Sequence, residues 1–234
     1  MRRIAAKEEL SLNMVAKDEV ISEVLLKLQN NNDIILKGGT AINRVYIKNK
    51  RFSEDIDCDL IFKGEIKAAI TRTNEIMGNI KGLTIARPRI MKGTIRYDLT
   101  YINPLQNQDK IRVEFKVLSE ASNYSKRIVY VGFVPSDPAL MNVYDVEEII
   151  RQKIDCIMHR MEGKDFFDVY YLLDIPHAPI KELKEKKKEI IKRILLEEKQ
   201  IKIVANIANH YIPRGRRPEW DSFLEEVRQK IEKY

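Results

Sequence analysis

Two stretches of sequence near the N-terminus indicate the fold class and the candidate site. They read Leu36-Lys37-Gly38-Gly39-Thr40-Ala41 and Arg51-Phe52-Ser53-Glu54-Asp55-Ile56-Asp57-Cys58-Asp59. An apolar run precedes the two glycines and a helical pattern follows them, which predicts a strand, a tight turn and a helix. The second stretch alternates acidic and apolar residues, which predicts a strand over 56–62.

The acidic stretch predicts a pair of metal ligands. Asp55 and Asp57 are two residues apart on the expected strand, so their side chains point to the same face, while Ile56 points to the core. Two converging carboxylates repel each other unless a cation lies between them. Oxygen ligands favour Mg²⁺ or Mn²⁺. The alternatives are a solvated strand face or a calcium loop, and the spacing of glycine and glutamate excludes the loop.

The glycine pair predicts a nucleotide-binding turn. Gly38 and Gly39 allow positive φ angles and a close approach of the backbone to a ligand. The N–H groups of the helix that follows favour the phosphates of an NTP. Thr40 either adds a hydroxyl contact or caps that helix. Ser53 is a further candidate for a phosphate contact, and a plain tight turn is the alternative interpretation.

A third carboxylate completes the predicted metal site. Glu114 lies on an expected strand over 111–117, where it alternates with apolar neighbours. Its neighbours Arg112 and Lys116 equally suit an ordinary polar face. Asp59, which continues the acidic alternation, is the weaker alternative to Glu114.

The remaining pattern predicts a mixed α/β half followed by a helical half. Helices are expected over 17–30, 41–47, 65–80, 146–159, 165–173, 181–205 and 220–233, and further strands over 34–36, 83–86, 94–102 and 128–133. The Pro135-Ser136-Asp137-Pro138 stretch marks the expected boundary between a domain of residues 1–135 and one of residues 136–234. The expected fold class is therefore α+β with a mixed sheet.

Composition narrows the class of partner. The 234 residues carry a formal net charge of +7, which favours polyanions such as nucleic acid. With 3 His and 2 Cys that form no CxxC pair, a zinc site is not expected. No apolar run suits a signal peptide or a membrane span, so we expect a cytoplasmic, reduced protein with no membrane partner.

These motifs resemble a known family. A Gly-Gly turn followed by Asp-x-Asp is similar to the signature of the polymerase-β-like nucleotidyltransferase superfamily. More narrowly, the two stretches resemble the AbiEii/AbiGii abortive-infection toxins of type IV toxin-antitoxin systems. That family also has a later helix with a Lys, then an Arg, then an acidic pair, and this chain has Lys153, Arg160 and Lys164-Asp165-Phe166-Phe167-Asp168. The resemblance spans residues 34–173.

The resemblance implies a fold, a reaction and a set of roles. The fold would be a nucleotidyltransferase domain completed by the helical half, and the enzyme would move an NMP from an NTP to an acceptor. It implies that Gly38, Gly39 and Thr40 cradle the phosphates and that Asp55 and Asp57 bind the metal.

For the helical half, the resemblance implies that Lys153 contacts a phosphate and that Asp168 orients Lys153 or the acceptor. Without the resemblance, Lys153 reads as a solvated helix lysine, and Asp165 and Asp168 read as a helix N-terminal acid and a surface acid. The implied acceptor is the 3′ end of tRNA, and the implied partner is a cognate antitoxin. The alternatives are a small-molecule or protein hydroxyl as acceptor, or a non-catalytic RNA-binding module.

Overall fold

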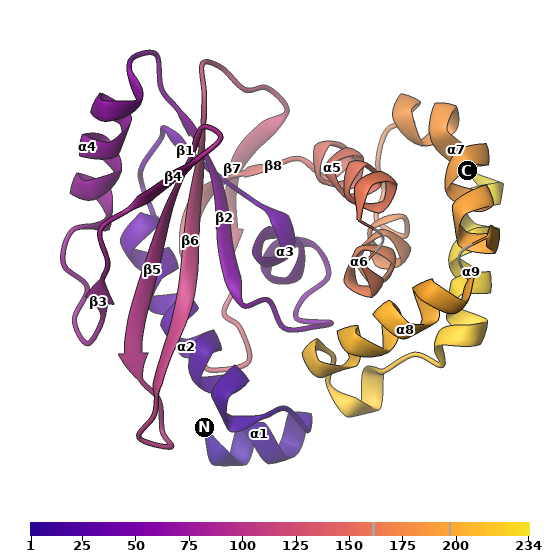
Figure 1. Cartoon of the computed structure of the whole chain (residues 1–234), viewed down its shortest axis with the longest axis horizontal. Coiled ribbons are helices and arrows are strands. Elements are labelled where there is room, and N and C mark those ends of the chain that lie inside the picture. Colours follow the sequence, from indigo (N-terminus) through magenta and orange to yellow (C-terminus); the bar gives the residue numbers. More distant parts are fainter. Residues whose placement is uncertain (161, 197) are drawn as a thin grey trace. The chain divides into compact units, whose positions relative to one another are not determined.

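The computed structural model describes residues 1–160, 162–196 and 198–234, which form two compact units, Met1–Tyr144 and Asp145–Tyr234 (Figure 1). The first unit contains α1 (Arg2–Glu8), α2 (Leu12–Leu28), β1 (Ile34–Lys37), α3 (Gly38–Ala41), the π-helical turn η1 (Ile42–Tyr46), β2 (Asp55–Ile61), α4 (Ile66–Met77), β3 (Thr84–Ile85), β4 (Arg89–Met91), β5 (Thr94–Ile102), β6 (Gln108–Leu118), β7 (Tyr124–Val129) and β8 (Ala139–Tyr144).

The first unit is built on a mixed sheet of these strands. The strand order is β3-β5-β6-β2-β1-β8-β7, and β4 pairs with β5. β2 runs antiparallel to β1 and parallel to β6, so it lies in the middle of the sheet. This position holds the acidic strand rigidly between two neighbours.

One face of the sheet is covered by α2 and α4. The apolar residues of the central strands, among them Cys58, Val113 and Phe115, are buried. Tyr97 of β5 is buried beside them, and its hydroxyl contacts Thr73 Oγ1 of α4 at 2.8 Å. The opposite face carries the acidic residues of β2, and α3 lies on that side (Figure 1).

A buried ion pair ties α2 to η1. Arg44 Nη2 donates to Asp18 Oδ1 at 2.7 Å, and Arg44 Nη1 donates to Ser22 Oγ at 2.8 Å. The backbone N–H of Val134 donates to Asp18 Oδ2 at 2.9 Å. Charges buried in this way are tolerated because each one has partners.

The second unit is helical. It contains α5 (Val146–His159), α6 (Gly163–Leu172), α7 (Lys181–Leu196), α8 (Glu198–Ala208), the 3-10 turns η2 (Asn209–Tyr211) and η3 (Arg214–Arg216), and α9 (Trp220–Lys233). Phe166 and Phe167 of α6 are fully buried, and Phe167 packs against Phe223 of α9 with ring centroids 6.0 Å apart. In the described part of the chain, no helix has the length and apolar character needed to span a membrane.

The predicted α+β arrangement of a mixed sheet followed by helices is confirmed, with local differences. The helix predicted from residue 17 begins at Leu12, because Ser11 caps it by accepting from the N–H of Met14 at 3.2 Å. The strand predicted over 128–133 is β7, which lies earlier. The predicted helix over 181–205 is α7 and α8, and residue 197 lies outside the described residues.

The predictions also omitted α1, β4 and β8. β8 pairs with β1 and β7, so it belongs to the first unit, and the contacts divide the chain after Tyr144 rather than after residue 135. The Pro-rich stretch that indicated a boundary precedes β8 and is the loop that leads into this strand.

Candidate active site

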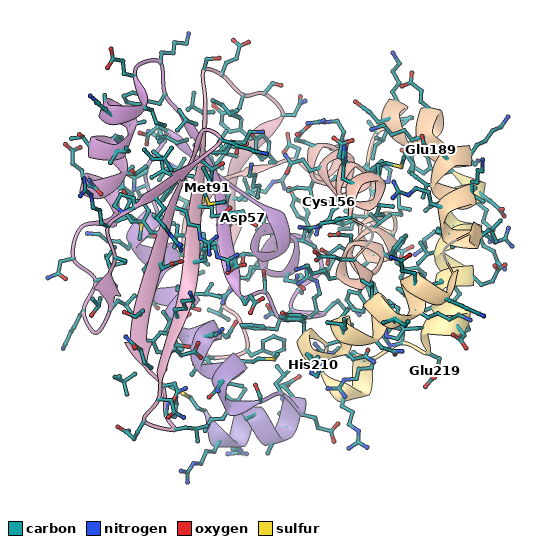
Figure 2. All side chains as sticks on the ribbon, viewed as in Figure 1. Asp57, Met91, Cys156, Glu189, His210 and Glu219 are labelled. Atoms are coloured by element: carbon teal, nitrogen blue, oxygen red, sulfur yellow. The ribbon has the colours of Figure 1, made fainter. Side chains whose placement is uncertain are left out.

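The glycine turn and the acidic strand lie against each other. Gly38 directly follows β1 and has a φ of +66°, in the left-handed region that favours glycine. A β-carbon placed on Gly38 would overlap the carboxylate of Asp57 and would lie 3.1 Å from the Asp57 β-carbon. Figure 2 labels Asp57, whose side chain lies between β2 and α3. Glycine is therefore required here both for its φ angle and for the space that Asp57 occupies.

Gly39 has close neighbours from the loop before β2. A β-carbon on Gly39 would lie 2.7 Å from Ser53 Oγ and 2.9 Å from Arg51 Nη2. Asn43 ties the turn to this loop, because its Nδ2 donates to the carbonyl of Gly39 at 2.9 Å and its Oδ1 accepts from the N–H of Arg51 at 3.0 Å. Four of the predicted residues, Gly38, Gly39, Ser53 and Asp57, are thus brought together.

Thr40 has a different partner from those predicted. Its side chain is fully buried, and its hydroxyl donates to the carbonyl oxygen of Asp55 at 2.5 Å. The N-cap position of α3 is Lys37, with no side-chain cap, so the predicted capping role of Thr40 is wrong. The hydroxyl instead fixes the start of β2 against α3, which positions Asp55 through its backbone.

The three predicted metal ligands share one face of the sheet. Asp57 is the register partner of Glu114 in the parallel β2–β6 pair, so both side chains rise from the same face. The Asp55 carboxylate lies 3.5 Å from Arg112 Nη1, and the Glu114 carboxylate lies 3.8 Å from Arg96 Nε. Basic side chains are thus interleaved with the acidic ones on this face.

The donor set fits a hard divalent cation in part. Asp55 and Asp57 present carboxylate oxygens from alternate positions of one strand, and such oxygens are the donors that Mg²⁺ prefers. Across residues 1–160, 162–196 and 198–234, no group of three or more Asp, Glu, His or Cys side chains is gathered closely enough to hold a metal ion. The two aspartates therefore fit such a cation as a pair, and Glu114 does not complete a group of three in this conformation.

Asp59 belongs to a separate cluster on the same face. Its carboxylate is buried, forms an ion pair with Lys37 and accepts from Tyr144 Oη at 2.6 Å. Lys37 is the register partner of Asp57. The sequence offered Asp59 as a weaker third ligand and assigned nothing to Lys37 or Tyr144, because the pairing of β1 with β2 and β8 was not evident from local patterns.

In the second unit, Lys153 of α5 lies against two aspartates of α6. Lys153 Nζ of α5 lies 2.7 Å from Asp165 Oδ1 and 2.8 Å from Asp168 Oδ2, and both aspartates of α6 are fully buried. Arg160 Nε donates to Asp165 Oδ2 at 2.9 Å. We call these four residues the α5–α6 charge cluster.

The α5–α6 charge cluster lowers the pKa of Asp165. Burial alone would raise the pKa of Asp165, but Lys153 and Arg160 outweigh burial and lower the pKa to about 2. The same contacts raise the pKa of Arg160, since its guanidinium is hydrogen-bonded to that carboxylate. Lys153 and Asp168 are both buried, so the interpretations of Lys153 as a solvated lysine and of Asp168 as a surface acid are wrong. The signal available in the sequence was the i, i+3 spacing of the two aspartates.

The chain is similar to known nucleotidyltransferases in sequence and in fold. The family model described as "Nucleotidyl transferase AbiEii toxin, Type IV TA system" matches residues 20–233. Among solved structures, JHP933 from Helicobacter pylori is similar at a TM-score of 0.62 and 15% identity, with 95% of this chain and 92% of that chain covered. MenT4, a nucleotidyltransferase toxin from Mycobacterium tuberculosis, is similar at a TM-score of 0.61 and 12% identity, with 98% and 87% covered. No curated protein matches the sequence.

Proposed function

Because the chain belongs to the AbiEii family of nucleotidyl transferase toxins, we propose that it transfers an NMP from an NTP to the 3′ end of tRNA with the help of a divalent metal ion. The observation that carries this proposal is the contact between the glycine turn and the acidic strand. Gly38 leaves room for the Asp57 carboxylate, so a nucleotide bound at the turn would have its phosphates next to Asp57.

In this proposal, the first unit binds the nucleotide and the metal. Gly38, Gly39 and Ser53 face the phosphates, and Thr40 supports them by holding β2 against α3. Asp55 and Asp57 would hold Mg²⁺ or Mn²⁺, and Glu114 is the candidate to join them. When bound, the cation would stabilise negative charge on the phosphate oxygens.

Lys153 and Asp168 enter the proposal through the family resemblance. Asp168 is a positioning residue, because its carboxylate holds the Lys153 ammonium at 2.8 Å. The carboxylates of Asp165 and Asp168 both contact the Lys153 ammonium and fix its position. A positive charge held in this way would offset charge that develops during phosphoryl transfer.

The proposed acceptor is supported by charge and by family. The net charge of +7 favours a polyanion such as tRNA, whose phosphates dominate binding to basic proteins. As a type IV toxin, the protein is expected to have a cognate antitoxin.

The test is transfer of label from NTP to RNA. The purified protein is incubated with Mg²⁺, total tRNA and each α-labelled NTP in turn, and the products are separated on a denaturing gel. We expect label on tRNA from one preferred NTP, no label with Asp57→Ala, and label retained with the control Asp98→Asn. Asp98 lies on the same sheet face, where it pairs with Arg96.

The other outcomes separate the alternatives. NTP consumption without labelled RNA would favour a small molecule or a protein hydroxyl as acceptor. RNA binding without NTP consumption under any metal condition would contradict the enzymatic proposal and favour a binding module.

A further inference from the structure

A charge network next to the glycine turn has no role in the function proposed above. It consists of Lys37, the last residue of β1, Asp59 of β2 and Tyr144 of β8. The Lys37 ammonium forms an ion pair with Asp59 Oδ1, and Tyr144 Oη donates to Asp59 Oδ2 at 2.6 Å. Tyr46 of η1 donates its hydroxyl to the carbonyl of Tyr144, which ties the helical segment after the glycines to the same network.

The network places a cation on the carboxylate face of the sheet. Lys37 is the register partner of Asp57, so its side chain rises from the face that carries Asp55 and Asp57. Lys37 also precedes Gly38 in sequence, and Asp57 lies against Gly38. The Lys37 side chain therefore leaves the backbone next to both parts of the proposed nucleotide site, and its ammonium lies at Asp59, two residues along β2 from Asp57.

Lys37 is more exposed to solvent than its two partners, Asp59 and Tyr144. The Asp59 side chain is 5% exposed, and Tyr144 is buried, whereas the Lys37 side chain is 20% exposed. The carboxylate and the phenol thus hold the lysine from within the protein, while part of the lysine side chain reaches solvent. A lysine held in this way loses little further conformational freedom when it meets an anion, so the interaction is preorganised.

We propose that Lys37 contacts the triphosphate of the NTP and that Asp59 and Tyr144 position its ammonium for this contact. The inference rests on the proposed function, because it assumes that an NTP binds at the glycine turn. The competing explanation is an ion pair that stabilises the sheet and never meets the ligand.

The experiment measures nucleotide binding by calorimetry, without turnover. The wild type, Lys37→Ala and Lys37→Arg are titrated with the preferred NTP and with the corresponding NMP. Lys126→Ala is the matched control, because Lys126 is an exposed lysine of β7 on the same face of the sheet. We expect Lys37→Ala to weaken NTP binding by about 10- to 100-fold, the loss of one charge-assisted contact. Lys37→Arg should restore most of the affinity, and NMP binding and Lys126→Ala should be unchanged.

Tyr144→Phe tests the positioning role and also covers the case in which Lys37→Ala does not fold. It removes one hydrogen bond to Asp59 and keeps the ion pair. We expect a loss of NTP affinity of about threefold to tenfold with unchanged NMP affinity, because Tyr144 acts through the ammonium of Lys37.

Two results would overturn the inference. One is unchanged NTP affinity in Lys37→Ala together with a lower free energy of unfolding, which would identify a purely structural ion pair. The other is an equal loss of affinity for NTP and NMP, which would exclude the terminal phosphates as the contact. If the wild type binds no NTP at all, the proposed function fails first, and this outcome is distinct from both.

Discussion

The carboxylates of β2 and those of α6 are held in contrasting ways. The Asp55 side chain is 32% exposed and its ion pair with Arg112 is long, at 3.5 Å. Asp165 and Asp168 are fully buried, and the α5–α6 charge cluster balances their two negative charges with Lys153 and Arg160. Charges buried with short, complete pairing are costly to disturb, whereas exposed carboxylates remain accessible to a ligand. We therefore infer that changes at Asp55 and Asp57 act mainly on activity and that changes at Asp165 act mainly on stability.

The largest effect on stability is expected from Asp165→Asn. It removes the charge of the buried carboxylate that pairs with both Lys153 and Arg160, and breaking a buried pair costs about 3–5 kcal/mol of unfolding free energy. Urea unfolding followed by tryptophan fluorescence reports on this unit, because Trp220 of α9 is the only tryptophan.

The control for this change is Asp155→Asn. The Asp155 side chain is 40% exposed and pairs with Arg151 and Lys186 in the same unit, so we expect a loss below about 1 kcal/mol. Equal losses in the two variants would remove the distinction between buried and exposed carboxylates.

The next effect is a dependence of stability on pH. The pKa of Asp165 is lowered from 3.8 to about 2 in the folded protein, so its contribution is complete above about pH 4 and is lost as the pH falls through about 2. A shift of this size corresponds to about 2 kcal/mol. The difference in unfolding free energy between wild type and Asp165→Asn should shrink over this window. A difference that stays constant would show that Asp165 does not titrate as described.

A smaller effect on stability is expected from Gly38→Ala. An alanine at a φ of +66° costs about 1–2 kcal/mol, and its β-carbon would displace the Asp57 carboxylate. Activity should therefore fall further than stability alone explains. Thermal unfolding by circular dichroism and the tRNA labelling assay measure the two effects on one sample. Full activity in a stably folded variant would show that the position of Asp57 does not matter.

The smallest effect on stability is expected from Asp57→Asn. A partly exposed carboxylate contributes little to folding, so we expect the unfolding free energy to change by less than about 1 kcal/mol. Activity should fall by more than about 100-fold, since even changes to residues behind a metal ligand cost 10- to 100-fold. Unfolding curves and initial rates test the two halves of this prediction. A large loss of stability with residual activity would reverse the comparison of the two regions.

The sequence predicted the parts of the fold that depend on local pattern. The predicted family, enzyme class and mixed sheet followed by helices are confirmed. They could be predicted because the glycine turn and the alternating acids are evident in the order of residues. The metal and nucleotide ligands stay predictions. β8 was missed because a proline-rich stretch precedes it and Asn142 interrupts its apolar run.

What the sequence did not reveal are contacts between distant segments. The pairing of Asp59 with Lys37 and Tyr144 depends on strand order across β2, β1 and β8, which no local pattern encodes. The burial of Lys153 depends on how α6 packs on α5, and burial is the physical quantity that separates a paired lysine from a solvated one.

The buried pair of Asp18 and Arg44 has a consequence for anyone who trims this protein for laboratory work. The family match begins at residue 20, so a fragment cut to the matched region would lack Asp18. Such a fragment would keep the Arg44 guanidinium in the interior without its carboxylate, and the N–H of Val134 would lose its acceptor as well. The region that the family model matches is thus smaller than the unit that must be produced together, and shortened versions should retain α2 from its Ser11 cap onward.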